Sequence, residues 1–386
     1  MSAKINVPTE RPATTGSNGN RLPLHAICPY LAMFPEGFVR AHVQEHSDPG
    51  EWVFDPFCGR GTTILESLLL GRRAGGSDIN PVAYCISRAK AEPPTPTALQ
   101  ARISLLEGRY RSAPTEDLQK ERRALPPFFR RAFYPTTLRE VLFLRSVLNW
   151  RRNRTDRFIA ALALGSLHGE MDRSRSYFSN QMPRTICLKP KYSLDYWRKN
   201  GLFPKKRRVF QMLKQKGDHR LKGLPELPSG QVRIADARAS SARFPELVGK
   251  VQLVVTSPPY LNVTRYEEDQ WLRLWFLGGE PRPTYNRVSK DDRHENPAKY
   301  WQFLRESWAG VAPLMTRPAV IVVRLGAIGL DEAEMTRELT ASLRSAFPKL
   351  KMVASPVRSS IASRQARSFL PRSRGCLFEV DFTFAV

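Results

Sequence analysis

Four consecutive residues with unusual chemistry follow a short apolar run at residues 251–255. They are Ser257, Pro258, Pro259 and Tyr260. Each proline fixes its own φ and restricts the residue before it, so the carbonyls of Ser257 and Pro258 are expected to be fixed acceptors. Such acceptors beside an aromatic ring suit an exocyclic amino group on a flat heterocycle. A proline loop after a core strand, with Tyr260 capping the core, explains the same residues.

A glycine turn occurs much earlier, where an apolar run at residues 52–54 leads into the string DPFCGRGTT at residues 55–63. Glycines let the backbone approach a ligand closely, and a helix that starts at Thr62 or Thr63 presents free N–H groups. The spacing is not the dinucleotide fingerprint. Asp78 lies about 20 positions past the turn and is placed to accept hydrogen bonds from ribose hydroxyls. A surface Asp that opens a turn is the alternative.

Both motifs resemble those of one enzyme family. The string TSPPY at residues 256–260 is similar to the catalytic motif of the DNA amino-group methyltransferases, which use S-adenosylmethionine. In that family the residue before the two prolines is Asp, Asn or Ser, and the Ser form resembles the cytosine-N4 branch more than the adenine-N6 branch. The string DPFCGRGTT resembles the cofactor-binding motif of the same enzymes. The resemblance implies cofactor contacts from Asp55, Phe57, Gly59, Gly61 and Thr62.

Two further segments extend the resemblance. Residues 28–39 are similar to the short segment that precedes the cofactor loop in the family, which makes Phe34 and Pro35 candidate contacts for the methionine part of the cofactor. An aromatic loop packed on the core is the alternative. Asp236 follows a segment at residues 231–235 that is expected to be a strand, and it resembles the acidic position that accepts from the cofactor adenine. A helix cap or a salt bridge to Arg238 is the alternative there.

The elements around these motifs alternate between strands and helices. Strands are expected at residues 52–54, 73–77, 231–235, 251–255 and 319–326, and a terminal antiparallel pair at residues 351–355 and 377–384. Helices are expected after the glycine turn, after Asn80, which is a candidate N-cap, and over residues 331–347. With the resemblance, this pattern predicts an α/β, Rossmann-like class I methyltransferase fold. Its sheet is expected to be mostly parallel and seven-stranded, with an antiparallel terminal strand.

The segment between the second and third strands is far longer than the dozen or so residues of an ordinary crossover. It is basic, with helical apolar spacing and interleaved aromatic residues. We therefore predict a disordered leader at residues 1–20, a cofactor-binding half at 21–91, a mainly helical insertion for DNA target recognition at 92–230, and a catalytic half at 231–386. Within the insertion, Asn180 and Gln181 are candidates for base-edge contacts. Hydrogen-bonded loop residues are the alternative.

The chain is strongly basic. Its 386 residues contain 61 Lys and Arg against 36 Asp and Glu, which gives a formal net charge of +25. A surplus of this size favours a polyanionic partner bound through phosphate contacts and counterion release. Nucleic acid is the leading candidate, and an anionic membrane surface is the weaker one. The family resemblance implies that the nucleic acid is double-stranded DNA. The Ser/Arg-rich stretch at residues 358–374 is expected to be a loop, with disorder in the free protein as the alternative. It supplies four candidate phosphate contacts: Arg364, Arg367, Arg372 and Arg374.

Cysteine usage and hydropathy exclude several classes of protein. The five cysteines (Cys28, Cys58, Cys85, Cys187 and Cys376) are scattered, without CxxC pairs or nearby histidines. Neither a disulfide framework nor a metal site is therefore predicted. The sequence has no apolar run of about 18 residues and no apolar signal segment at its N-terminus. We expect a soluble, cytoplasmic protein, associated with the nucleoid if it is bacterial, and no membrane partner.

Together with these observations, the family resemblance implies a site-specific DNA methyltransferase that forms N4-methylcytosine by base flipping and direct in-line transfer. In this mechanism Ser257 and the Pro258 carbonyl hold the amino hydrogens while Tyr260 holds the face of the base. Adenine-N6 methylation is the main alternative. Methylation of structured RNA and a non-catalytic nucleic-acid-binding protein are the others. The sequence leaves open the recognition site, the oligomeric state and a companion restriction endonuclease.

Overall fold

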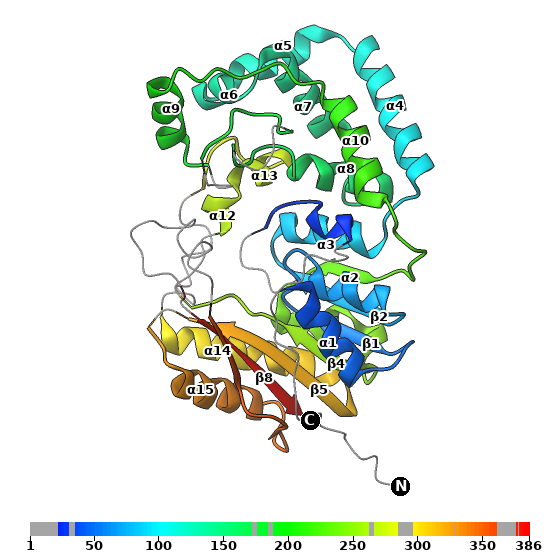
Figure 1. Cartoon of the computed structure of the whole chain (residues 1–386), viewed down its shortest axis with the longest axis vertical. Helices are drawn as coiled ribbons and strands as arrows, with labels where there is room; N and C mark the ends of the chain where they lie inside the picture. Colours follow the sequence, from blue (N-terminus) through cyan, green and yellow to red (C-terminus); the bar gives the residue numbers. More distant parts are fainter. Residues whose placement is uncertain are drawn as a thin grey trace.

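A computed structural model describes residues 22–30, 35–171, 176–183, 188–261, 266–284, 296–327, 329–360, 376 and 378–386. In the described chain, a twisted sheet with helices on both faces occupies one end of the molecule, and a layer of helices occupies the other (Figure 1). None of the described helices is both long enough and apolar enough to cross a membrane.

The sheet contains the following strands in the described residues: β1 (Trp52–Asp55), β2 (Arg73–Asp78), β3 (Gln231–Ile234), β4 (Val251–Thr256), β5 (Met315–Gly326), β6 (Lys351–Met352), β7 (Val357–Ser360) and β8 (Phe378–Ala385). They lie in the order β3-β2-β1-β4-β5-β8-β6. The first five are mutually parallel, whereas β8 runs antiparallel to β5. The predicted Rossmann-like α/β fold with an antiparallel terminal strand is confirmed.

The sheet differs from the prediction at its far edge. β6 pairs with residues 384–385 of β8, and β7 pairs with residues 378–381 of the same strand. The two short strands therefore share one edge position, and the described sheet has eight strands in seven positions. The strand expected at residues 351–355 is shorter than predicted. Arg358, at the start of the stretch expected to be a loop, instead belongs to β7.

Alternating residues of the central strands explain why helices cover both faces of the sheet. On one face, Val39 and Val43 of α1 (Glu36–His46) join a cluster with Val255 of β4. On the other face, Val254 clusters with Trp308 of α14 (Pro297–Val311). The flanking helices in the described residues are completed by α2 (Thr62–Leu69), α3 (Pro81–Ala91), α11 (Ser240–Arg243) and α15 (Glu332–Arg344).

The segment predicted to be a helical insertion contains α4 (Pro96–Ser112), α5 (Thr115–Ala124), α6 (Pro127–Ala132), α7 (Pro135–Val147), α8 (Arg154–Leu164), α9 (Pro190–Lys199) and α10 (Val209–Leu221). These helices share one apolar core with α3, which joins the helical layer to the sheet. Two helices that follow β4 also lie in this part of the molecule: α12 (Tyr266–Asp269) and α13 (Trp271–Phe276) (Figure 1). Trp271 and Trp275 are buried in the same core, so the helical layer includes residues from beyond the segment 92–230.

Candidate active site

The two motifs of the sequence meet at the carboxyl ends of β1 and β4. These strands are adjacent and parallel. The Thr256 hydroxyl donates a hydrogen bond of 2.6 Å to Oδ1 of Asp55, and the Thr63 hydroxyl donates one of 3.0 Å to the Val255 carbonyl. The turn at residues 257–260 therefore begins next to the glycine turn. Ligand sites in open α/β sheets occur at such strand ends.

The glycine turn has the left-handed backbone that its sequence requires. Gly59 has φ +49° and Gly61 has φ +73°, and Gly61 directly precedes α2. A Cβ at Gly61 would lie 2.8 Å from Cα of Ser87, so helix α3 packs directly against this glycine. Thr62 begins α2 as predicted, but its hydroxyl is buried and accepts a hydrogen bond of 3.1 Å from Nε of Arg60.

Asp78 fixes the shape of the glycine turn. Its Oδ2 accepts from the backbone N–H of Gly59 at 2.9 Å, and its Oδ1 accepts from the N–H of Asn80 at 2.8 Å. Burial raises the pKa of Asp78 to about 6, although these backbone N–H groups act in the opposite direction. Asn80 in turn caps α3 by accepting from Val82 N–H, which confirms its predicted role. The contact of Asp78 with a ribose stays a prediction.

Asp55 carries a buried polar atom without a protein partner. Its Oδ1 accepts from Thr256 and from the N–H of Phe57, which lies 3.0 Å away. Among the described residues no group donates to its Oδ2, because the nearby Thr63 hydroxyl donates to Val255. Burial raises the pKa of Asp55 to about 7. An unpartnered carboxylate oxygen at a strand end fits a cationic ligand group, such as the ammonium at the methionine end of S-adenosylmethionine.

Tyr30 lies beside the glycine turn, although no sequence motif singled it out. Its hydroxyl accepts a hydrogen bond of 3.1 Å from Nδ2 of Asn80 and also hydrogen-bonds to the side chain of Gln270. A Cβ at Gly59 would lie 3.6 Å from its ring. Burial raises the pKa of this phenol well above its usual range. The sequence signal for Tyr30 is its place in the segment 28–39, which also contains the predicted contacts Phe34 and Pro35.

The other predicted cofactor residues lie at varied places. Phe34 lies outside the described residues, and Pro35 is exposed immediately before α1. Phe57 is half-buried, and its ring meets that of Phe303 edge-on at 5.9 Å. These placements leave the predicted contacts of Pro35 and Phe57 as predictions.

Asp236 follows β3, on the far side of β2 from the glycine turn. Its carboxylate accepts from Nε and Nη2 of Arg238 at 3.0 and 2.9 Å, and its Oδ1 also accepts from the Arg238 backbone N–H at 3.0 Å. The cap and the salt bridge weighed as alternatives therefore both occur. Arg238 also pairs with Glu306 at 3.1 Å. A contact between Asp236 and the cofactor adenine stays a prediction.

The proposed catalytic turn is anchored to the sheet through Tyr260. The Ser257 hydroxyl donates to the Tyr260 hydroxyl at 3.3 Å, and Tyr260 donates to Oε1 of Glu379 at 2.8 Å. Pro258 is buried, and Ser257 and Pro259 are half-buried. The Tyr260 ring packs so closely on Gly326 that a Cβ there would lie 2.9 Å from it. Tyr260 is only 7% exposed, so in this structure it also caps the core, as the alternative proposed.

A buried charged network continues from Glu379 and was also missed. Arg324 binds both carboxylate oxygens of Asp381 at 2.6 and 2.7 Å, and its Nη1 lies 3.7 Å from Oε2 of Glu379. Burial raises the pKa of Glu379, and Arg324 opposes that shift. Burial also raises the pKa of the Tyr260 phenol, with the Glu379 charge acting in the same direction. Tyr260 is therefore neutral and remains a hydrogen-bond donor at neutral pH.

The insertion candidates have structural partners. Nδ2 of Asn180 donates to the Arg131 carbonyl at 2.8 Å, and Nε2 of Gln181 donates to the Glu170 carbonyl at 2.9 Å. The hydrogen-bonded alternative therefore holds for both amides, and their contact with base edges stays a prediction. Four predicted phosphate contacts lie outside the described residues: Arg364, Arg367, Arg372 and Arg374.

Comparison with known proteins bears on the cofactor half. Residues 9–88 match the model of the N6/N4 DNA methylase family. The resemblance to amino-group DNA methyltransferases is confirmed over this stretch, which includes Asp55, both turn glycines and Asp78, and the assignment of S-adenosylmethionine as cofactor is confirmed with it. The match does not reach residues 257–260, and the choice between N4 and N6 is not resolved.

Two curated relatives share short segments with this chain. A Type II methyltransferase, M.MvaI of Kocuria varians, is 44% identical over 55 residues, which cover 14% of this chain and 12% of that protein. M.MjaII of Methanocaldococcus jannaschii, also a Type II methyltransferase, is 32% identical over 69 residues, which cover 18% and 13%. The matched segments thus span about an eighth of each relative.

Among solved structures, the rRNA methyltransferase aviRa of Streptomyces viridochromogenes aligns over 94% of this chain and 89% of its own. It does so with 13% identity and a TM-score of 0.37.

Proposed function

We propose that this protein transfers a methyl group from S-adenosylmethionine to the exocyclic N4 amino group of cytosine in double-stranded DNA, at a specific sequence. One observation carries the proposal. The hydrogen bond from Thr256 to Asp55 holds the turn at residues 257–260 next to the glycine turn, at the ends of neighbouring strands. An amine-binding turn and a cofactor turn at one sheet edge are the two parts that direct transfer to an amino nitrogen needs.

Each residue of the site has its own role in the proposed reaction. When bound, S-adenosylmethionine supplies an electrophilic methyl group on a sulfonium. The unpartnered Oδ2 of Asp55 is suited to its cationic methionine end, and the Asp78-bound glycine turn allows close approach of its backbone. The Pro258 carbonyl and the Ser257 hydroxyl accept the amino hydrogens, which favours a tetrahedral nitrogen whose lone pair can attack. The methylated nitrogen then loses one of these protons to solvent. We assign to Tyr260 the ring on which a flipped base stacks.

A nucleoside analysis tests the proposed activity. The protein is incubated with methyl-labelled cofactor and duplex DNA, and the DNA is digested to nucleosides. Label in N4-methylcytosine is the expected result, whereas label only in N6-methyladenine would move the enzyme to the adenine branch, which the family match accommodates equally well. In a parallel incubation with total cellular nucleic acid, label that DNase treatment leaves in place and RNase removes would indicate an RNA substrate.

A non-catalytic nucleic-acid-binding protein is the competitor from another class. The intact glycine turn and the orphan oxygen of Asp55 argue against it, because a binding module needs neither. Calorimetry with S-adenosylmethionine separates the two. Absence of cofactor binding, together with salt-sensitive DNA binding, would support a non-catalytic binding module.

The relatives' Type II designation is compatible with a companion restriction endonuclease. Co-purification of a DNA-cleaving activity from the native host tests that partner.

A further inference from the structure

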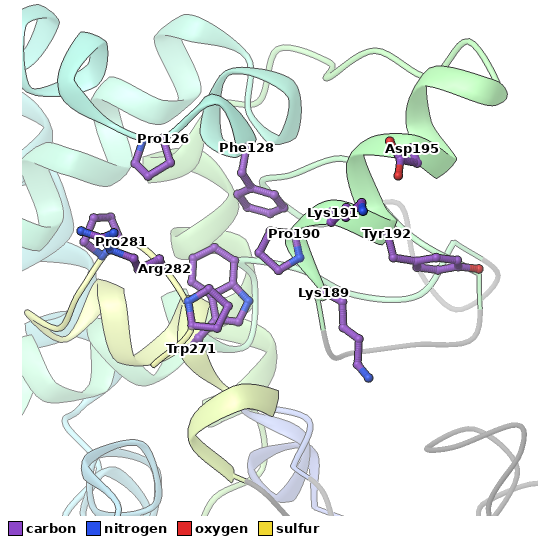
Figure 2. A pocket seen from close by; sticks show the side chains of 11 residues that line it. Pro126, Phe128, Lys189, Pro190, Lys191, Tyr192, Asp195, Trp271, Pro281 and Arg282 are labelled. Atoms are coloured by element: carbon purple, nitrogen blue, oxygen red, sulfur yellow. The ribbon is translucent and has the colours of Figure 1, made fainter. Parts of the chain in front are cut away.

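A pocket of about 730 Å³ opens in the helical layer, away from the sheet. Three segments that are far apart in the sequence line it: the start of α6, the start of α9, and the start of α13 with the turn after it. Figure 2 shows Phe128, Pro190 and Trp271 close together, with Tyr192 and Lys189 extending outward from α9. Its volume is in the range of small-molecule sites and is ample for one nucleotide.

The floor of this pocket is apolar and rigid. The rings of Phe128 and Trp271 meet edge-to-face at 5.1 Å, and the two side chains are 3% and 2% exposed. The indole Nε1 of Trp271 donates a hydrogen bond of 2.7 Å to the Leu188 carbonyl, which joins α13 to the residue before Lys189. Four prolines complete the floor: Pro126, Pro190, Pro281 and Pro283. A surface that is already ordered loses little conformational entropy when a flat ring binds to it.

The rim of the pocket is cationic and aromatic. Lys189, Lys191 and Arg282 are exposed, and none of them makes an ion pair with any residue that the structure describes. Asp195 is the single acid of the lining, and it lies 3.2 Å from Arg198. Tyr192 is 63% exposed, which is unusual for an aromatic side chain. Exposed cations beside an exposed aromatic ring and an apolar floor are the features that bind a nucleic-acid strand.

A hydrogen-bonded path connects the pocket to the glycine turn that is predicted to bind the cofactor. Gln270 is buried directly before Trp271, and its side chain hydrogen-bonds to Tyr30. The Tyr30 hydroxyl accepts from Asn80, whose backbone N–H binds Asp78. A side chain on the pocket floor is therefore one residue and a few hydrogen bonds away from the loop that holds the cofactor. A strand bound in the pocket would lie on the part of the helical layer that contacts the active site.

We propose that this pocket binds the DNA strand beside the target nucleotide. This inference rests on the proposed DNA methyltransferase function. Phosphates of the strand contact Lys189, Lys191 and Arg282. One base lies on the floor formed by Phe128, Trp271 and the prolines, with Tyr192 against it. Phosphate contacts dominate affinity and position the protein, whereas base stacking tolerates different sequences. The pocket therefore contributes affinity more than sequence specificity.

Salt-dependent DNA binding tests this assignment with a matched pair of variants. The pocket variant is Lys189→Gln/Lys191→Gln/Arg282→Gln. The control removes the same charge from exposed residues by α15, at the end of the molecule away from α9: Arg344→Gln/Lys349→Gln/Lys351→Gln (Figure 1). Binding of a fluorescent duplex is measured by anisotropy at several KCl concentrations, with S-adenosylmethionine affinity and thermal unfolding recorded for each protein.

The pocket variant is expected to lower the slope of log K against log[salt] by about 2 to 3, because about 0.9 is lost with each phosphate contact. The control is expected to change that slope little, and both variants should keep cofactor affinity. Tyr192→Ala should weaken binding of single-stranded DNA about fivefold or more, since stacking contributes roughly 1–3 kcal/mol for each base. Equal effects of the pocket and control variants would overturn the assignment, as would stronger binding of RNA than of DNA through the pocket.

The outcome separates this inference from the proposed activity, because binding requires no methyl transfer. If the protein methylates DNA but the pocket variant behaves like the control, only the assignment of the pocket is rejected. If the protein binds DNA through the pocket but labels no nucleoside, the proposed activity is rejected and the assignment of the pocket stands.

Discussion

The Tyr260 hydroxyl donates a 2.8 Å hydrogen bond to Glu379, joining the turn after β4 to the antiparallel strand β8. Both residues are largely buried. The Tyr260 ring packs against Gly326, where a side chain would not fit. Tyr260 is therefore held by a specific partner as well as by the two prolines before it. Glu379 acts on the site through Tyr260, which makes it a positioning residue of the proposed reaction.

Tyr260→Phe keeps the ring and removes this hydrogen bond. Glu379 then loses its donor in a buried environment, so the free energy of unfolding should fall by about 1–3 kcal/mol. The ring also loses its anchor, and we expect kcat for DNA methylation to fall about tenfold, which corresponds to about 1.4 kcal/mol. The Kd for S-adenosylmethionine should stay unchanged. Single-turnover kinetics, calorimetry and urea unfolding provide the three measurements.

Variants of Glu379 supply the control. Glu379→Gln keeps a side-chain oxygen that accepts from Tyr260, so its kcat should remain close to that of the wild type. Glu379→Ala should resemble Tyr260→Phe, and the double variant should be little worse than either single one, because both remove the same interaction. Strictly additive losses in kcat would show that the two residues act independently.

Burial of Asp55 should make stability depend on pH. The folded-state pKa of about 7 is above the ordinary value of 3.8, so the folded protein binds this proton more tightly than the unfolded chain. The resulting stabilisation is complete below about pH 4 and is lost as pH rises toward about 7. Relative to Asp55→Asn, which cannot titrate, the wild type should lose about 2–4 kcal/mol across that interval. Urea unfolding at several pH values measures the difference.

The same carboxylate should make cofactor binding depend on pH in the opposite sense. A cationic ligand group binds the charged form, so the affinity for S-adenosylmethionine should rise between about pH 5.5 and 7.5 as Asp55 ionises. The rise should be much smaller in Asp55→Asn. Calorimetry across this range provides the measurement, and an identical pH profile in the two proteins would remove Asp55 from the cofactor site.

Local motifs were readable from the sequence because proline and glycine restrict or free their own backbone. The turn at residues 257–260, the positive φ of Gly59 and Gly61, and the Asn80 cap depend on neighbouring residues only. The mostly parallel sheet with an antiparallel terminal strand was accessible through the family resemblance. The division into the segments 21–91, 92–230 and 231–386 stays a prediction, and the packing of α13 on the helical layer shows that the chain crosses between them.

Side-chain pairs that depend on strand register could not be predicted from the sequence. Glu379 faces Gly326 and Asp381 faces Arg324 only because β8 pairs with β5 in one particular antiparallel register. No local pattern in either strand sets that register. The visible signal was charge inside apolar strands, at Arg324, Glu379 and Asp381. Similarly, an apolar stripe on α13 predicts that Trp271 and Trp275 are buried but does not say against which helices.

Gly61 should be far less replaceable than another glycine with nearly the same backbone conformation. Gly61 and Gly71 have φ values of +73° and +75°, but only at Gly61 would a Cβ meet backbone atoms, 2.8 Å from Cα of Ser87. Gly71→Ala should cost about 1–2 kcal/mol through the left-handed conformation alone. Gly61→Ala should cost more, because α3 must move, and should also weaken cofactor binding. If Gly61→Ala and Gly71→Ala lose the same stability and the same cofactor affinity, the close approach of α3 to Gly61 does not matter.

Tyr30→Phe should loosen the corner that joins α13 to the cofactor turn. The change leaves Nδ2 of Asn80 without its acceptor and removes the hydrogen bond to Gln270, while the ring beside Gly59 stays in place. Stability should fall by about 1–3 kcal/mol, since buried polar groups lose their partner. Cofactor affinity should fall several-fold, because Asn80 and Asp78 shape the same turn.

Tyr84→Phe is the matched control: Tyr84 is half-buried on α3, and its hydroxyl has no hydrogen bond to any described residue. Calorimetry and urea unfolding of both variants decide the question. Indistinguishable results would assign Tyr30 to packing alone.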